Sequence, residues 1–198
     1  MINLNNTKLF YVLFCTVLGF IILLPTLFEV MTLPSGEDFS ELWLLGSNHI
    51  IENDSFDIST TTPFSVYLGV ANEMGALEFY RIYVKLGNLS DPLPNRADGL
   101  PSPLQPIFEY NLFLENGEES EREFIFSFED VSFEENICQI SQLSINGNDV
   151  QIDKTVVWDD VNGGFHCSLI FELWIYNITT SDFQFHNRSV WFWMTLNT

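Results

Sequence analysis

The chain has 198 residues, of which 27 are acidic and 7 basic, giving a formal net charge of −20. This balance excludes a nucleic-acid binder that works through phosphate neutralisation, because such proteins need clustered lysine and arginine. Hydrophobic residues make up 46% of the chain and aromatic residues 15%, far more than a disordered acidic tail carries. The acidic residues therefore belong to a chain that folds.

A long uncharged run lies near the N-terminus. Residues 9–28 (LFYVLFCTVLGFIILLPTLF) contain no charged side chain, and a helix rising about 1.5 Å per residue would span the roughly 30 Å hydrocarbon core of a bilayer. A cleaved signal peptide is the alternative, but its apolar region usually runs about 7–15 residues and ends at a small-x-small site, which PTLFEVMTLPSG lacks. We expect an uncleaved signal anchor over residues 9–30, after a short cytoplasmic N-terminus (1–8) and before a stalk (31–37).

The charges beside this run predict its orientation. Lys8 precedes it, whereas Glu29, Glu37 and Asp38 follow it, and positive charge favours the cytoplasmic side. We therefore expect a single-pass protein of the cell membrane, with the C-terminal domain, residues 38–198, outside the cell.

Two features agree with an exterior location. Cys138 and Cys167 are the only cysteines after the apolar run, which suits one disulfide in an oxidising compartment, although two buried thiols are the alternative. Acceptor triplets for N-glycosylation, Asn-x-Ser/Thr, also arise by chance in a chain rich in these residues. Within residues 34–198 they occur at Asn53, Asn88, Asn177 and Asn187.

Strand patterns dominate the rest of the chain. In Leu77–Leu86 (LEFYRIYVKL), strict alternation would turn Ile82, Val84 and Leu86 towards a core. Short aromatic and β-branched runs separated by turn residues, with no helical period, predict an all-β fold: an immunoglobulin-like antiparallel β-sandwich. The expected strands are 39–46, 64–70, 77–86, 107–114, 123–128, 137–145, 166–176 and 189–196.

Two connections differ from the strands in composition. Residues 91–106 (DPLPNRADGLPSPLQP) hold five of the eight prolines, which predicts a long crossover between the two sheets. A polyproline ligand for a partner's aromatic groove is the alternative. Residues 115–123 (ENGEESERE) predict a solvated hairpin loop.

The acidic residues raise the question of calcium. Calcium takes six to eight oxygen ligands, and loops at the end of a sandwich can supply them. No EF-hand spacing is present, however, and a charged solubilising surface is the simpler interpretation. The weak calcium candidates are Glu118, Glu119, Glu121, Asp159 and Asp160.

Patterns typical of enzymes are scarce. Among His49, His166 and His186 only His166 adjoins a possible ligand, Cys167, and a zinc or copper centre needs three or four convergent ligands. Neither a phosphate-binding glycine pattern nor a nucleophile elbow occurs. We expect no catalytic activity, no metal site and no cofactor.

The strand at the C-terminus is apolar on both faces. Residues 190–194 read VWFWM, which indicates either a strand covered on both sides or one whose second face is an exposed patch. Exposed aromatic patches bind proteins or sugars, whereas packing against the proline-rich connection is the alternative. The interaction candidates are Trp191, Trp193, Trp174 and Trp43.

These segments resemble a known family. FSELWLLGSN, DISTTTPFSVYLGVANEMGALEFYRIYVKL, FELWIYN and SVWFWMTLNT resemble the extracellular part of archaeal membrane proteins grouped as domain of unknown function 1616. The resemblance covers about residues 37–87 well and the last 30 weakly. It is carried by Phe39, Glu41, Leu44, Leu45, Gly46, Gly69, Val70, Asn72, Tyr80 and Val84.

The resemblance implies an immunoglobulin-like sandwich outside the membrane, and it brings no activity or catalytic residue with it. The chain departs from the family in its proline-rich connection, in a probable insertion at 129–165, and in having one span where many members have several.

Two functional hypotheses follow. The first is a membrane-anchored ectodomain with a structural or protein-interaction role, for example an accessory subunit that docks to another envelope or membrane protein or to a glycan. The second is an extracellular ligand- or calcium-binding module that uses the acidic loops.

Overall fold

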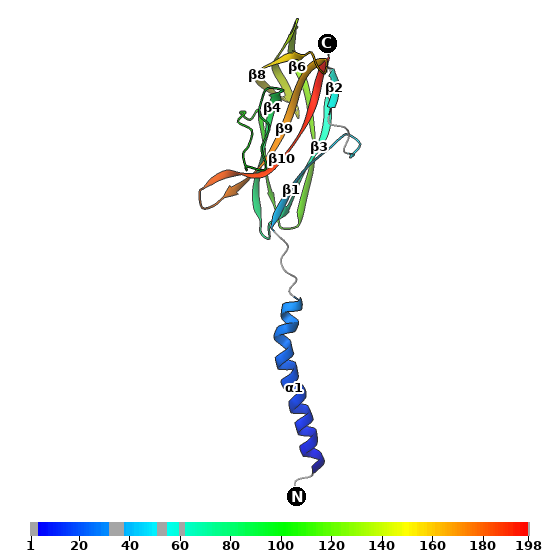
Figure 1. The fold of residues 1–198 in the computed structure, drawn as a ribbon, viewed down its shortest axis with the longest axis vertical. Helices are drawn as coiled ribbons and strands as arrows, with labels where there is room; N and C mark the ends of the chain where they lie inside the picture. The colour runs from blue at the N-terminus through cyan, green and yellow to red at the C-terminus, as the bar shows by residue number, and fades with distance from the viewer. Residues whose placement is uncertain (1–3, 32–37, 51–54, 60–61, 198) are drawn as a thin grey trace. The chain divides into compact units, whose positions relative to one another are not determined.

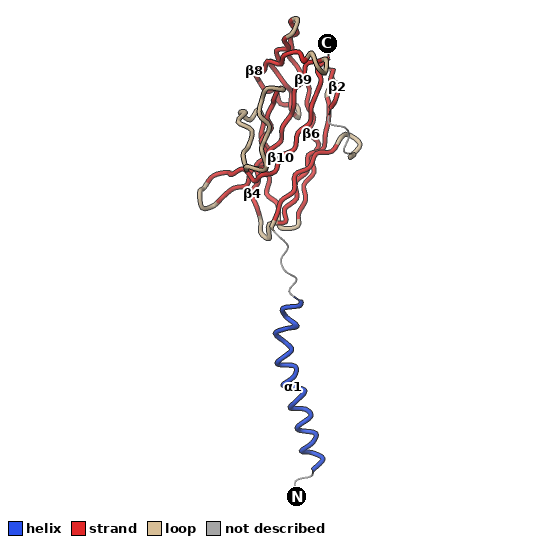
Figure 2. Tube along the Cα trace, in the orientation of Figure 1, coloured by secondary structure: helices blue, strands red, loops and turns tan. Residues whose placement is uncertain are grey.

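The computed structural model describes residues 4–31, 38–50, 55–59 and 62–197. The chain forms two compact units, Met1–Asp38 and Phe39–Thr198. The first holds one helix, α1 (Leu4–Met31), and the described regular structure of the second is entirely strand (Figures 1 and 2).

Helix α1 occupies the region expected to be an anchor. It runs for 28 residues, and its apolar side chains from Phe10 to Leu24 are largely exposed. Over the part of the chain that the structure describes, no helix is long and apolar enough to cross a membrane. The crossing by residues 9–30 therefore stays a prediction.

The second unit is all-β and mostly antiparallel. Its strands form two layers, β1-β3-β6-β7-β8 (the first sheet) and β5-β4-β9-β10-β2 (the second sheet), joined where Trp158 and Asp159 pair with Phe165 and Gly164. Among the strands that the structure describes, only β2 pairs in parallel, with β10. The strands are β1 (Phe39–Leu45), β2 (Ser55–Ser59), β3 (Phe64–Glu73), β4 (Glu78–Asn88), β5 (Phe108–Leu114), β6 (Glu118–Glu134), β7 (Ile137–Ile145), β8 (Asn148–Asp159), β9 (Gly164–Asn177) and β10 (Asp182–Asn197).

The core lies between the two layers and is lined by every second residue of the strands. Ile82, Val84 and Leu86 of β4 are all at most 4% exposed, so the predicted inward face of this strand is confirmed. Aromatic rings bridge the layers: Phe124 of β6 lies 5.0 Å from Phe171 of β9, edge to face. Such contacts add to the free energy of burial of the rings themselves.

The prediction of a hairpin loop at 115–123 is wrong for most of these residues. The turn is confined to Glu115–Gly117, and β6 starts at Glu118 and pairs with β3 from there on. Its glutamates at 119, 121 and 123 share the outer face of the first sheet, as the register with β3 shows. The dense charge marked one solvated face of a long strand rather than a loop.

Two strands lie where none was expected. β2 is one, and β8 lies inside 129–165, the segment regarded as an insertion. That segment is integral to the first sheet, because Ile140, Leu143 and Ile145 of β7 are fully buried. The polar residues of β8 concealed its alternation, in which Val156 faces the core.

The proline-rich segment 91–106 does not cross between the sheets. It connects β4 and β5, which are neighbours in the second sheet and pair from Glu78↔Leu114 to Val84↔Phe108. Within it only Asn95 and Leu100 form an isolated bridge. It is therefore a long loop between adjacent strands, and we call residues 89–107 the proline-rich loop.

Cys138 of β7 and Cys167 of β9 are both buried in the core as free thiols. Burial raises the pKa of Cys138 to about 11. Burial and the neighbouring Cys138 raise the pKa of Cys167 as well. The disulfide between them is not formed in this structure and stays a prediction.

A close approach between β1 and β3 gives a stability prediction. A Cβ built on Gly69 would lie 2.0 Å from the indole of Trp43, its cross-strand partner. Gly69→Ala should therefore displace Trp43 and lower the free energy of unfolding by about 1–3 kcal/mol, measured by denaturant unfolding. In a Trp43→Ala background the same change should cost much less, and an unchanged cost there would contradict this explanation.

Candidate functional site

The outer face of the second sheet carries a row of aromatic side chains. Register pairs Phe79 of β4 with Phe113 of β5, and Tyr176 of β9 with Phe183 of β10. We call these four residues the aromatic cluster. They point away from the core because the residues alternating with them in β4 and β5, such as Tyr80 and Leu112, are buried in it.

The rings of the cluster contact one another. Phe79 stacks on Phe113 with centroids 4.1 Å apart and meets Phe183 edge to face at 5.0 Å. Tyr176 lies 5.3 Å from Phe183. The guanidinium of Arg81 lies 4.1 Å from the centre of the Phe183 ring, within the range of a cation–π contact.

This surface is both aromatic and open. The side chain of Phe113 is 63% exposed and that of Leu77, at the start of the same face, 62%. The row continues along the sheet through Trp174, which meets Tyr83 edge to face at 5.3 Å. Tyr176 and Phe183 lie where β9 ends and β10 begins. These parts of the two strands form a hairpin that projects beyond the sheet (Figure 1).

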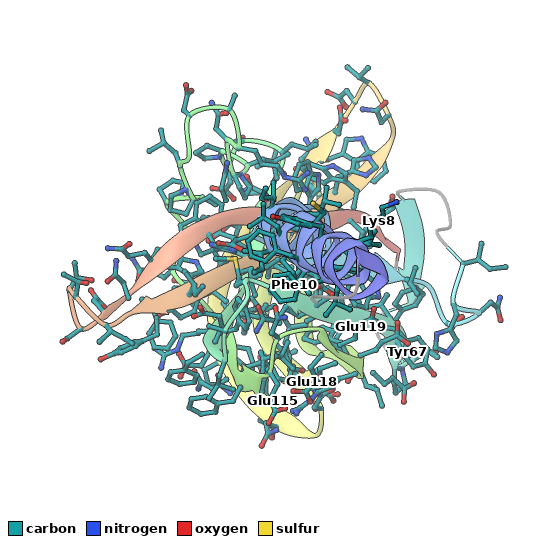
Figure 3. The ribbon with its side chains drawn as sticks, turned by 90° about the horizontal axis from the view of Figure 1, so that it is seen from below. Lys8, Phe10, Tyr67, Glu115, Glu118 and Glu119 are labelled. Atoms are coloured by element: carbon teal, nitrogen blue, oxygen red, sulfur yellow. The ribbon has the colours of Figure 1, made fainter. Side chains whose placement is uncertain are left out.

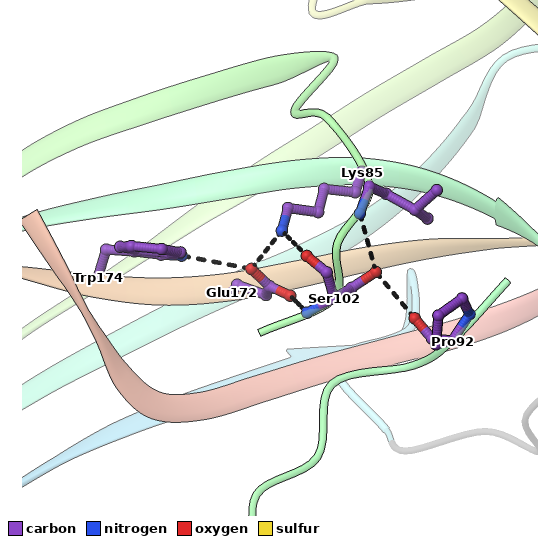
Figure 4. Close-up of polar contacts among 6 residues, drawn as sticks. Lys85, Pro92, Ser102, Glu172 and Trp174 are labelled. Atoms are coloured by element: carbon purple, nitrogen blue, oxygen red, sulfur yellow. Dashed lines mark hydrogen bonds and ion pairs between the residues drawn. The ribbon is translucent and has the colours of Figure 1, made fainter. Parts of the chain in front are cut away.

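The proline-rich loop covers the next part of the same face, and a buried ion pair holds it there. Lys85 Nζ donates to Glu172 Oε2 at 2.7 Å and to the Ser102 carbonyl at 2.6 Å. Glu172 Oε1 accepts from the Ser102 N–H at 2.6 Å (Figure 4). Lys85 and Glu172 are 3% and 0% exposed, so both charges are satisfied by one another and by the loop's backbone.

Side chains around the pair extend this clamp. Trp174 Nε1 donates to Glu172 Oε2 at 3.3 Å, and Ser102 Oγ donates to the Pro92 carbonyl at 2.9 Å. Arg96 of the loop donates to the Ser189 carbonyl and lies over the Trp191 ring. The loop is thus ordered by polar contacts with β4, β9 and β10.

The four tryptophan candidates do not form one patch. Trp174, Trp191 and Trp193 share the outer face of the second sheet, but Trp191 is half-buried beside Arg96 and the loop. Trp43 lies on the first sheet, over Gly69, with its Nε1 donating to Glu121 at 3.0 Å. Trp174 lies in β9, which pairs with the strand that holds residues 190–194, whereas Trp43 lies in β1 of the other sheet.

A buried polar network closes one end of the sandwich. Ser40 Oγ lies 2.6 Å from the Tyr80 hydroxyl and 3.0 Å from His186 Nε2. Tyr80 donates to Asn72 Oδ1 at 3.0 Å, and Arg188 Nε donates to the Ser40 carbonyl at 2.9 Å. Ser40, Tyr80 and Asn72 are fully buried, and the network joins strands of both sheets.

The calcium candidates are not gathered in one place. Glu118, Glu119 and Glu121 lie at the start of β6, and Figure 3 labels the first two beside Glu115. Asp159 ends β8, which runs parallel to β6 because both flank β7 in antiparallel pairs; it and Asp160 therefore lie at the opposite end of the first sheet. Among the described residues no three acidic, histidine or cysteine side chains are grouped to hold a metal ion.

The histidines and sequons occupy separate positions. His49 stacks on Tyr67 and pairs with Glu121, and His166 Nδ1 lies 3.1 Å from Thr195 Oγ1. Asn88, Asn177 and Asn187 lie at the ends of β4 and β9 and within β10. Asn53 lies outside the described residues.

Sequence reasoning missed most of the aromatic cluster. It placed Phe79 on the face opposite the core of β4 but assigned that face no role. Phe113 and Phe183 gave no sign of their location, because only the pairing of β4 with β5 and of β9 with β10 brings them together. Alternation within β9, where Trp174 and Tyr176 share a face, was the one signal available.

Comparison with known proteins adds little to this description. Neither a protein-family model nor a curated protein matches the chain. A β-glucosidase from Listeria innocua bound to gluconolactone is similar with a TM-score of 0.34 and 10% identity, over 82% of this chain and 16% of the enzyme. The same enzyme bound to isofagomine gives a TM-score of 0.33 with the same identity and coverage. Likeness at this level carries no argument, and membership of the domain of unknown function 1616 family stays a prediction.

The ion pair under the loop predicts a strong dependence on each partner. Lys85→Met should lower the free energy of unfolding by about 3–5 kcal/mol, because Glu172 would be left as an unpaired buried charge. The double change Lys85→Met, Glu172→Leu should cost less than the sum of the single changes, measured by denaturant unfolding. Glu109→Gln, which removes the exposed partner of Arg81, is the control and should cost at most about 1 kcal/mol.

His186 predicts a loss of stability in acid. Burial and the nearby Arg188 lower its pKa, whereas in the unfolded chain it titrates near about 6.5. Below that pH the unfolded chain binds more protons, so the free energy of unfolding should fall as pH drops from about 6.5 towards the lowered pKa.

Urea unfolding at about pH 7.5 and 5.5 measures this slope. His186→Gln should reduce the slope, because it removes the half-buried histidine whose pKa is lowered. Equal slopes in the wild type and the His186→Gln variant would rule out this origin of the pH dependence.

Proposed function

We propose that residues 39–198 form a membrane-anchored binding module that docks to another protein of the cell envelope through the aromatic cluster. The observation that carries the proposal is the exposure of Phe113 and Leu77 beside a layer of mutually contacting rings and Arg81. Soluble surfaces rarely leave contiguous aromatic groups in water without an interaction to make.

The chemistry of the cluster favours a protein as the partner. Tyrosine, tryptophan and arginine dominate the residues that supply binding energy in protein interfaces, and Tyr176, Trp174 and Arg81 lie together here. Small-molecule sites are enclosed cavities, whereas this surface is the outer face of a sheet. With a net charge of −20, the module attracts a partner whose docking surface is apolar with a basic rim.

Further features support the remaining parts of the proposal. The uncharged run at residues 9–28 lies within helix α1, which suits an anchor with residues 38–198 outside the cell. The parallel pairing of β2 with β10, next to antiparallel β9, β4 and β5, is compatible with an immunoglobulin-like sandwich. The role is that of an accessory subunit without catalysis.

Loss of the partner on changing Phe113 tests the proposal. The full chain is purified from its native membrane in mild detergent, and the co-purifying proteins are quantified by mass spectrometry. One companion should appear in fixed ratio to the wild type and fall roughly tenfold or more with Phe113→Ser, as expected for a residue worth at least about 1.4 kcal/mol of binding.

Val157→Ser is the matched control, because Val157 is 58% exposed on β8 of the other sheet. It should keep the companion, and both variants should keep the melting temperature of the wild type. A companion retained in full by the Phe113→Ser variant, or absent from the wild type, would reject the proposal.

A further inference from the structure

Three acceptor triplets for N-glycosylation lie in the described part of residues 39–198, and they differ in what their side chains do. A transferase must reach both the asparagine amide and the hydroxyl two residues later. The three asparagines are all half-buried, so the fold distinguishes the sequons by the contacts of these two groups, which the sequence alone cannot do.

Asn187 is closed by the fold. It lies in the bulge of β10 between Phe185 and Arg188, with φ at 57°, and its Oδ1 is buried without a hydrogen-bond partner among the described residues. Its hydroxyl residue, Ser189, is 1% exposed and accepts from Arg96 Nε at 3.3 Å. A sugar on Asn187 would have to displace this packing and the contact with the proline-rich loop.

Asn88 is tied to the main chain. Its Nδ2 donates to the Thr155 carbonyl of β8 at 2.9 Å, and its Oδ1 accepts from the Ser90 N–H. A glycan there would replace one of the two Nδ2 hydrogens at a point where β4 meets β8.

Asn177 is placed differently, at the tip of the β9–β10 hairpin. Its Oδ1 accepts from the Thr179 N–H at 2.8 Å, which holds the triplet in a turn, and its Nδ2 donates to the exposed side chain of Gln184 at 3.0 Å. Thr179 is exposed and Ile178 is 85% exposed. The Thr179 hydroxyl is therefore at the surface, and the half-buried Asn177 has its amide nitrogen held by an exposed side chain alone.

Alternation also fixes the direction in which Asn177 points. Asn177 pairs with Asp182, and the next pair, Tyr176 with Phe183, belongs to the aromatic cluster. Successive residues of a strand face opposite sides, so the amide of Asn177 lies on the face of the hairpin away from the cluster.

From these contacts we infer that, among the described sequons of this domain, Asn177 is the one that is N-glycosylated, and that the glycan covers the back of the hairpin while leaving the aromatic cluster bare. In the transfer, Nδ2 of Asn177 forms a bond to the anomeric carbon of a polyprenyl-pyrophosphate oligosaccharide and gives up one proton. The bond from that carbon to the pyrophosphate oxygen breaks, and the lipid pyrophosphate leaves. The inference rests on the proposed location of the domain outside the cell.

Full-length chains with one sequon each test the inference. Translation in the presence of endoplasmic-reticulum microsomes supplies the transferase and a dolichyl-pyrophosphate oligosaccharide. Other sequons, including the one at Asn5 before the apolar run, are disabled at their hydroxyl residue (Thr7→Ala, Ser55→Ala, Ser90→Ala, Thr179→Ala, Ser189→Ala), which leaves the asparagine contacts in place. A control chain lacks all five native sequons and carries Glu118→Thr, which creates an acceptor at Asn116 in the exposed turn before β6.

The chain that keeps only Asn177 should shift on a gel, return on treatment with peptide N-glycosidase, and resist limited proteolysis as well as the unglycosylated domain does. The chain that keeps only Asn187 should stay unmodified, or be modified in a form that protease destroys. Glycosylation of the control with none at Asn177, or a protease-resistant glycoform at Asn187, would overturn the inference. If the control is also unmodified, the domain has not crossed the membrane, and the proposed location fails first.

Discussion

The proline-rich loop depends on the buried pair of Lys85 and Glu172. The loop has no strand of its own beyond one isolated bridge, so little regular backbone pairing holds it. The N–H of Ser102 donates to Glu172, and its carbonyl accepts from Lys85. The two buried charges therefore hold the 19-residue loop that connects β4 and β5. Removing either charge leaves the other uncompensated in the interior. The loop therefore stays attached at this point only when both Lys85 and Glu172 are present.

Because the loop is attached there, the outer face of the second sheet is divided. Ile170 of β9 is fully buried although it shares this face with Lys85 in the register, whereas Phe113, at the other end, is 63% exposed. The division decides which aromatic side chains stay available to a partner. Trp191, which looked like an anchor for an interface from the sequence, lies beside the loop with Arg96, and the open aromatic surface belongs to Phe79, Phe113, Tyr176 and Phe183.

The sequence predicted the class of fold and most strands, because alternation in segments such as 77–86 depends only on neighbours along the chain. The prediction failed where polar residues on a solvated face hid the apolar alternation of a strand. Charge in 115–123 masked the start of β6, and polar residues masked β8, since one face of each strand is solvated. The aromatic cluster could not be predicted, for a different reason. Phe113 of β5 and Phe183 of β10 come close only because their neighbours β4 and β9 pair with each other, and this pairing joins residues far apart in the sequence. The motif residues Gly69 and Asn72 proved to have packing roles, under Trp43 and within the Ser40 network.

The division of the N-terminal strand region between β1 in one sheet and β2 in the other has a mechanical consequence. β1 pairs antiparallel with β3, while β2 runs parallel to the end of β10, and the first and last strands of the domain begin and finish at opposite ends of the sandwich (Figure 1). A pull on Phe39 against a pull on the C-terminus therefore loads the ladder between β2 and β10 in shear, so its hydrogen bonds share the tension instead of opening one at a time. The placement of β1 in one sheet and β2 in the other therefore lets the folded domain resist a pull between Phe39 and the end of β10.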